Sequence, residues 1–520
     1  MEDLFSLDSV GLHILLAFRR VQRTYVEHGY ALRLSDVHKL GQLITQNSII
    51  NVGSWFILEA GIACNRYRPV PRVYFLSAAE VDCYERLQAN GTIGAKLHIP
   101  FPVLNRSSFG FWLSYFSVVS RVVLAMFWFA IQTYTGSECV YQMLKAIWPS
   151  IAHIPNHLPE SANITTAGIM CYFLYWLIQL PFLLVSPHKI RYLFIAKAIL
   201  APTAGLSMMI WAFARTGGGP IFAQKATVSG SALSWAMLSA MNSAIGNYAT
   251  LSVNIPDFTR YARSPRDQYI QILIIPVIFT FFAFMGIAVT SAGNVIYGEI
   301  LWDPLTLIDR WDNRAAAFFA SFAFCLATIG TNVSANSISA ANDFTALLPK
   351  VKNRSYSGNR LLTVDLDHRS AIGFLNFMGG YTVFLGPICS IMIVDYWLVH
   401  RGKIDVPALY DPKGRYKYTA GVNWRALLAL LVAVPPNLPG LIHSINPNIR
   451  VGMGAQHLFS IAWLLGFSLA GATYFIASKI FPPVDSMVDE LITGDDHNGV
   501  QHNSSDHTND EKSSDVKVLH

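Results

Sequence analysis

The sequence predicts an all-α integral membrane protein, because its composition and its hydropathy pattern both argue against a water-soluble fold. Of 520 residues, 52% are hydrophobic and 13% are charged, whereas a soluble domain carries about 25% charged residues. A helix needs about 20 mainly apolar residues to cross a bilayer. Nine stretches meet that requirement: 109–135, 168–185, 192–214, 230–255, 268–291, 315–340, 371–399, 424–443 and 456–480.

Net charge and cysteine content argue against two other classes of protein. The formal net charge of +6 is spread over short loops rather than gathered on one polar helix or arm, so we expect no nucleic-acid partner. The positive-inside rule accounts for the excess of Lys and Arg instead. Six cysteines are scattered along the chain without a C-x-x-C pair. They indicate neither a disulfide framework nor a metal site.

Loop charge orients the middle of the chain in the lipid bilayer. The segments 187–191 and 260–266 are basic, and we expect them to stay cytoplasmic. Successive loops alternate between the two sides of the membrane. The loop 136–166, one span before 187–191, and the acidic stretch 299–312, one span after 260–266, should therefore face outside.

The same rule fails further along the chain. The loops 349–370 and 400–417 are both basic, yet only one apolar stretch, 371–399, lies between them. A single span cannot join two cytoplasmic loops. Either one loop is misassigned or a transmembrane helix is missing near 356–370, a stretch that is itself too polar to be that helix.

The two ends of the chain differ in composition from the apolar middle. Residues 1–88 contain polar runs and no convincing span, so we treat them as an atypical N-terminal segment. Residues 484–520 are rich in Asp, Asn, Ser and His without periodicity, which predicts a disordered cytoplasmic tail. The transmembrane domain is therefore expected at 89–483.

Polar side chains inside spans are costly and tend to line a cavity or bridge helices. Trp128 and Gln132 stand four residues apart and so share one helix face. An indole beside an amide suits a planar ring that forms hydrogen bonds. The alternative is an interfacial Trp with a Gln that bonds a neighbouring helix, and these two residues alone do not decide between the two.

Two further spans carry polar patches. The stretch 246–250 reads Gly-Asn-Tyr-Ala-Thr, which predicts a broken helix of the kind that frames substrate sites in secondary transporters. The stretch 328–337 is rich in Thr, Ser and Asn. Small residues there could merely allow close helix packing, but Asn332 and Asn336 exceed what packing needs.

Signals for an enzyme are weak by comparison. The only close histidine pair, His153 and His157, has a proline between its members, which disfavours a preformed metal site. The glycine run 217–219 lacks the lysine and helix of a phosphate-binding loop. No catalytic constellation is apparent in the spans, so we expect neither an enzyme nor a cofactor.

Several stretches together resemble the nucleobase:cation symporter family, and specifically its fungal uracil/allantoin/uridine permease branch. They are LHIPFPVLNRSSFG at 97–110, IGNYATLSVNIPDFTRY at 245–261, GTNVSANSISAAND at 330–343, FLNFMGGY at 374–381, GVNWR at 421–425 and PNLPG at 436–440. They run in the family's order. The resemblance implies twelve helices, built as inverted five-helix repeats plus two extra helices, with substrate held mid-membrane.

The resemblance also assigns roles to residues. It implies that Trp128 stacks on a substrate ring, that Gln132 bonds the amide edge of the ring, and that Asn336 is the other main polar contact. Asn247 and Tyr248 would lie on the broken sixth helix.

A gate and a cation site are implied in the same way. The gate and selectivity filter would be formed by Phe374, Leu375, Met378 and Tyr381. Ala327 and Thr331 fall where sodium-coupled relatives bind their cation. Gly330 stands in place of a serine ligand there, which favours coupling to protons.

The sequence departs from the family pattern in two places. The first and second helices should precede residue 90, and the ninth should lie between 349 and 370, but neither region resembles them. We explain the departures by replaced coding sequence or by a degenerate paralogue. Without those three helices, the face of Trp128 and Gln132 would lack its opposing wall.

The main functional prediction is a proton-coupled permease that imports uracil, allantoin, uridine or a related ring across the plasma membrane. The alternative is a transport-inactive paralogue or sensor of the same fold. A membrane-embedded enzyme is a third reading, without a catalytic constellation behind it.

Overall fold

The computed structural model describes residues 89–493, apart from 160–161, 163, 186–190, 219–229, 263, 269, 300, 302 and 348–370. The described residues are helical, with two isolated β-bridges and no strand longer than these. Seven of their helical segments are long and apolar enough to cross a membrane. The predicted all-α membrane architecture is therefore confirmed.

The longer helices follow the predicted stretches. They are α6 (Ser114–Ile147), α7 (Thr166–Leu184), α8 (Arg191–Thr216), α10 (Gly230–Asn254), α12 (Ile270–Tyr297), α14 (Arg314–Thr331), α17 (Ala371–Val394), α18 (Trp424–Ala433) and α21 (Ala462–Ile480). Shorter helices connect or extend them: α5 (Phe101–Phe109), α11 (Pro256–Thr259), α13 (Pro304–Ile308), α15 (Ser339–Leu347), α19 (Leu438–Ile445) and α20 (Met453–Phe459).

Polar residues mark where several helices begin. Thr165 accepts a hydrogen bond from the Gly168 backbone N–H at the start of α7 (3.1 Å). Asn313 caps α14 in the same way, and Asn423 caps α18. A capping side chain satisfies one of the backbone donors that the first helical turn leaves without a partner.

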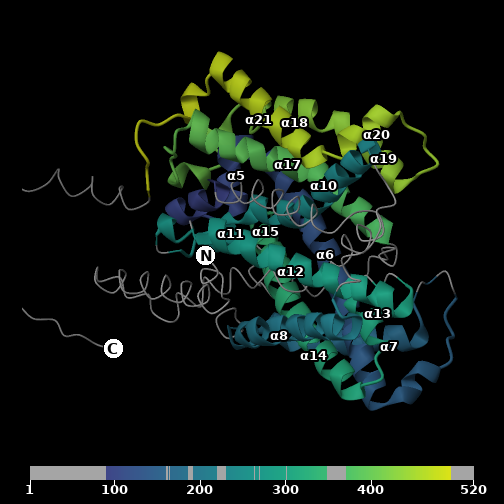
Figure 1. Cartoon of the computed structure of the whole chain (residues 1–520). Coiled ribbons are helices and arrows are strands. Elements are labelled where there is room, and N and C mark those ends of the chain that lie inside the picture. Colours follow the sequence, from purple (N-terminus) through teal and green to yellow (C-terminus); the bar gives the residue numbers. More distant parts are fainter. Residues whose placement is uncertain are drawn as a thin grey trace, which may run out of the picture.

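The helices pack around two apolar cores. One core joins α5 and the first half of α6 to α10, α17, α18 and α21, and the other joins the second half of α6 to α7, α8, α13 and α14. Figure 1 shows these groups as an upper and a lower half of the molecule. The helix α6 contributes to both cores, and the predicted ring site lies on it.

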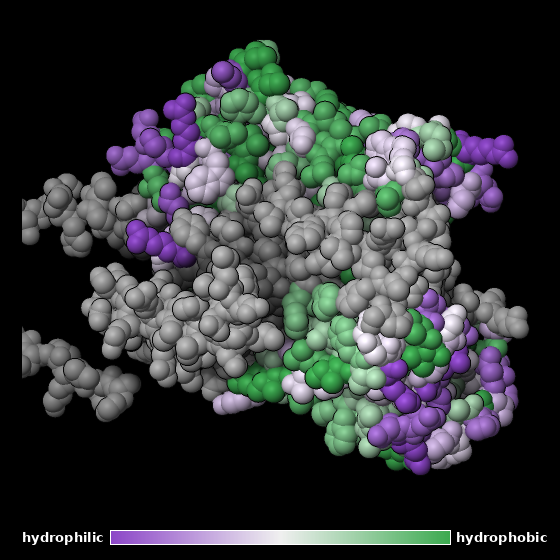
Figure 2. Space-filling model, in the orientation of Figure 1, coloured by the Kyte–Doolittle hydropathy of each residue, from purple (hydrophilic) through white to green (hydrophobic). Residues whose placement is uncertain are grey.

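The outer surface of the described helices is that of a protein in a bilayer. Large apolar side chains such as Phe319, Ile210 and Leu431 are more than 60% exposed. In Figure 2 hydrophobic residues cover the described flanks, while hydrophilic residues gather toward the two lateral ends of the view. Apolar flanks with polar ends are the distribution expected across a membrane.

The predicted break at 246–250 is wrong. The helix α10 runs without interruption from Gly230 to Asn254, and the chain turns only at Pro256, where α11 begins. A single glycine within a helix costs about 1 kcal/mol, which surrounding contacts can offset. Proline removes a backbone donor and interrupts a helix more strongly.

Part of the predicted disordered tail is also ordered. Residues 484–486 form a 3₁₀ turn, and Ile492 pairs with the loop that follows α17, where its N–H donates to the Ile404 carbonyl (3.1 Å). Composition missed this segment because the partners of Ile492, which are Ile404 and Val406, lie 88 and 86 residues away in the chain. Residues 494–520 lie outside the described part.

The end of α15 and the start of α17, which flank residues 348–370, lie at opposite ends of the helix bundle. The helix α5 contacts both α15 and the π-helical turn Asp395–Val399 that ends α17. The start of α17 therefore lies at the end of the bundle away from α5. The predicted missing ninth helix falls between α15 and α17, and the first two fall within 1–88, all outside the described residues.

Candidate substrate and cation sites

The predicted ring-binding side chains are buried within the helix bundle. Trp128 is 5% exposed and Gln132 is 3% exposed, and both lie on α6. Burial on this scale argues against the interfacial Trp that the sequence left as an alternative. An indole face beside an amide in a dry interior provides one stacking surface and both a donor and an acceptor.

Tyr381 joins Trp128 from the neighbouring helix α17. Its hydroxyl donates a hydrogen bond to the Gly246 carbonyl on α10 (2.7 Å), and its side chain also hydrogen-bonds that of Trp128. Three helices therefore meet around the Trp128 ring. Among the four predicted gate residues, Tyr381 is the one whose side chain the structure describes.

Five predicted side chains cannot be placed. Asn247 and Tyr248 lie within α10, and Phe374, Leu375 and Met378 lie within α17, but their side chains are outside the described part of the structure. Their assignments stay predictions.

Asn336 lies in a π-helical turn, Asn332–Ile338, between α14 and α15. Its amide nitrogen donates to Asn332 Oδ1 (3.0 Å), and the Asn332 nitrogen donates in turn to Thr133 Oγ1 and to Gln179 Oε1 (3.1 Å each). Single π turns are frequent at functional sites because they re-aim side chains. This network ties Asn336 to α6 and α7 beside the ring face.

A lysine from another helix reaches the predicted cation site. The Lys197 ammonium on α8 donates a hydrogen bond to Thr331 Oγ1 on α14 (2.8 Å), and both residues are fully buried. A side-chain Cβ at Gly330 would lie 2.8 Å from Lys197 Cδ. Glycine at this position therefore leaves the space that the lysine side chain occupies. Ala327 is likewise fully buried on α14.

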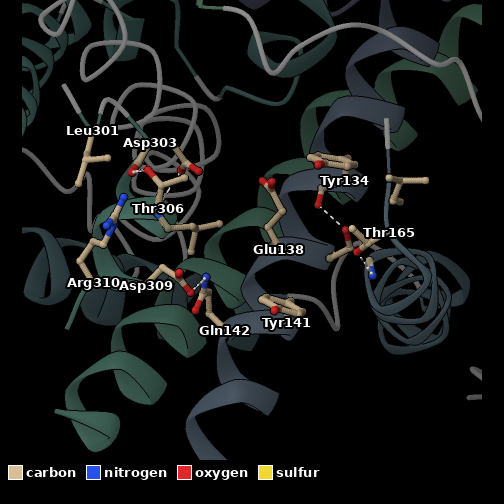
Figure 3. A pocket seen from close by; sticks show the side chains of 14 residues that line it. Tyr134, Glu138, Tyr141, Gln142, Thr165, Leu301, Asp303, Thr306, Asp309 and Arg310 are labelled. Carbon is tan, nitrogen blue, oxygen red and sulfur yellow. Dashed lines mark hydrogen bonds between the residues drawn. The ribbon is translucent and has the colours of Figure 1, made fainter. Parts of the chain in front are cut away.

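A separate cavity of about 500 Å³ lies between the second half of α6, the start of α7 and the α13 region. Figure 3 shows Glu138 on α6 facing Asp303 and Thr306 of the α13 region, while Gln142 on α6 donates a hydrogen bond to Asp309 (2.8 Å). Burial raises the pKa of Asp303 to about 6, against hydrogen bonds from Leu305 and Thr306 that lower it. Trp128, Gln132 and Asn336 do not line this cavity, so it is distinct from the predicted ring site.

Comparison with known proteins identifies the family. A family model described as a permease for cytosine/purines, uracil, thiamine and allantoin matches residues 77–466. The uracil permease of Saccharomyces cerevisiae is 36% identical over 423 residues, which cover 77% of this chain and 67% of that protein. The allantoin permease of the same yeast is 35% identical, with coverage of 78% and 67%. The chain belongs to this permease family.

Solved structures show the fold of the permease. Mhp1, a nucleobase-cation-symport-1 family transporter, was solved in a closed conformation with bromovinylhydantoin bound. It aligns with a TM-score of 0.65 at 19% identity, over 86% of this chain and 93% of Mhp1. Its inward-facing conformation aligns with a TM-score of 0.62. The predicted transporter fold class is confirmed, and the permease is a multi-pass membrane protein.

Sequence reasoning missed Lys197 and Gln179 as parts of these sites. A lysine in the middle of an apolar stretch was visible in the sequence and is a functional signal by itself. Its target was not visible, because Thr331 lies 134 residues further along the chain. Gln179 on α7 likewise accepts a hydrogen bond from Asn332 on another helical segment, and residue spacing along one helix cannot reveal such a contact.

Proposed function

We propose that this permease imports a planar, nucleobase-type ring across the plasma membrane by proton symport. The ring class is supported by the buried Trp128, Gln132 and Asn336 and by the names of the relatives, which are permeases for uracil and allantoin. The choice among uracil, allantoin, uridine and similar rings stays open, because an indole and two amides serve all of them.

The observation that carries the coupling proposal is the hydrogen bond between Lys197 and Thr331. An ammonium group beside Thr331 places one positive charge where the predicted cation ligands lie. A sodium ion at the same place would meet like-charge repulsion in a low-dielectric interior, where such repulsion is strong. The Lys197 amine therefore takes the place of a metal cation beside Thr331. An amine gains and loses a proton, so Lys197 is the group that we expect to carry the transported proton.

Coupling is tested by radiolabelled uptake in a host lacking its own nucleobase permeases. Uptake should be unchanged when choline replaces sodium, and it should collapse with a protonophore. Lys197→Met should abolish accumulation against a gradient while leaving substrate exchange, and Lys197→Arg should retain part of the accumulation. A sodium requirement at fixed pH, or full accumulation by Lys197→Met, would refute proton coupling through this residue.

The alternative is a transport-inactive chain or sensor of the same fold. The family model matches residues 77–466, and the prediction that residues 1–88 lack the first two helices stays untested. A transport-inactive chain would reach the membrane and bind the ring without saturable uptake. Binding of labelled uracil to purified protein, measured beside uptake in cells, separates the two functions.

A further inference from the structure

The short helix α20 covers the outer ends of two helices of the ring site. The Phe459 ring lies 3.2 Å from the position that a Cβ would take at Gly379 on α17, and it also packs on Gly440. The backbone N–H of Trp463, at the start of α21, donates a hydrogen bond to Asn242 Oδ1 on α10 (2.9 Å). These contacts join α20 and the start of α21 to α10 and α17, the two helices that carry Gly246 and Tyr381.

One aromatic contact fastens α20 to the start of α10. The imidazole of His457 and the indole of Trp235 are stacked with ring centroids 3.9 Å apart and planes 2° from parallel. Neutral aromatic pairs usually keep their centroids about 4.5 to 7 Å apart. A cation over the face of Trp gains an electrostatic attraction that a neutral ring does not. Protonation of the imidazole would therefore strengthen this stack.

The described helices around His457 carry no carboxylate that would stabilise its protonated form. The helices α10, α17 and α20 carry no other charged or histidine side chain. His443 on α19 is bonded through Nδ1 to the Ile449 carbonyl (2.8 Å), Arg450 follows in the loop, and Lys479 stands at the far, inner end of α21. Residues 219–229, which precede α10, are outside the described part.

We propose that His457 and Trp235 form a proton-dependent latch on the outer side of the permease. Acid outside the cell favours the protonated imidazole. The charged ring is held more firmly on Trp235, and α20 stays seated over α10 and α17. At higher external pH the stack weakens and α20 lifts more often. The proposal adds regulation by external pH to the proposed function and does not depend on which ring is carried.

The test is hydrogen–deuterium exchange of the backbone amides of α20 in purified, lipid-embedded protein, expressed as protection relative to the unfolded segment at each pH. The wild-type protection of α20 should rise about two- to fivefold between pH 7.5 and pH 5.5, the factor expected of an exposed cation–π contact. This readout requires no transport, so its failure and the failure of the transport proposal are distinguishable.

Three variants sharpen the test. His457→Phe keeps a ring on Trp235 but cannot gain a proton, so its protection should not change with pH. Trp235→Leu should give low protection at both pH values. His443→Gln, the matched histidine control in the same hairpin, should behave as the wild type. Equal pH dependence in His457→Phe and the wild type would overturn the latch, as would pH-independent protection in a wild type whose thermal unfolding is normal.

Discussion

At the scale of single residues, the account depends on Trp128 and the groups that hold it. The indole is buried on α6, and Tyr381 bonds it from α17. Spacing along one helix was enough to predict the pairing of Trp128 with Gln132, because residues four apart share a face. Spacing could not predict Tyr381 as a direct neighbour of Trp128, nor Lys197 beside Thr331, because these contacts depend on how separate helices pack.

Replacing the ring-site residues should weaken substrate binding without loss of the protein from the membrane. Base stacking and a buried hydrogen bond are each worth about 1 to 3 kcal/mol. Trp128→Ala and Gln132→Ala should therefore each raise the apparent KM for uptake about ten- to hundredfold. Trp148→Ala is the matched control, since Trp148 follows the same helix and is 55% exposed. Unchanged KM in both site variants would refute the assignment.

At the scale of elements, hydropathy predicted where helices lie but not how they end. The helices α7 and α8 agree with the predicted spans to within a few residues. The helix α6 begins at Ser114 and extends to Ile147, and α14 ends at Thr331, where a π turn interrupts the predicted span 315–340. The polar patch 246–250 suggested a break, yet α10 continues through it. Hydropathy does not report the side-chain contacts that support such a stretch, including the Tyr381 hydrogen bond to the Gly246 carbonyl.

The inner end of α17 contains a buried ion pair that ties several elements together. Asp395 Oδ1 lies 3.0 Å from His400 Nδ1 and accepts a hydrogen bond from the Tyr474 hydroxyl on α21 (2.6 Å). The other ring nitrogen of His400 bonds Ser486 Oγ (3.0 Å), in the segment that follows α21. Burial disfavours the imidazolium, but the attraction and hydrogen bonds of Asp395 outweigh it and raise the pKa of His400.

The His400 contribution to stability should depend on pH. A raised pKa in the folded protein means that this contribution is fully present below the unfolded value of about 6.5 and is lost as pH rises through the folded pKa. Breaking a buried pair costs about 3 to 5 kcal/mol. His400→Gln should therefore lower Tm strongly at pH 6 and much less at pH 9, measured by thermal unfolding in detergent. An equal drop at both pH values would contradict the ion-pair account.

At the scale of the whole molecule, the family and the fold class could be predicted because six motifs occur in the family's order. The motifs do not show whether the chain has all twelve helices that the resemblance implies. The helices expected before residue 90 and near 349–370 fall outside the described residues, although α15 ends and α17 begins at opposite ends of the helix bundle. The wall opposite Trp128 and Gln132 therefore stays a prediction.

The most direct test of the central claim is saturable uptake of radiolabelled uracil, allantoin and uridine by the full chain, tagged at its C-terminus, in cells that lack their own permeases for these compounds. Surface abundance is measured in parallel. The account predicts saturable, sodium-independent and protonophore-sensitive accumulation of at least one of the three rings, which Trp128→Ala reduces and Trp148→Ala does not. Normal surface abundance with no uptake of any of the three would contradict it.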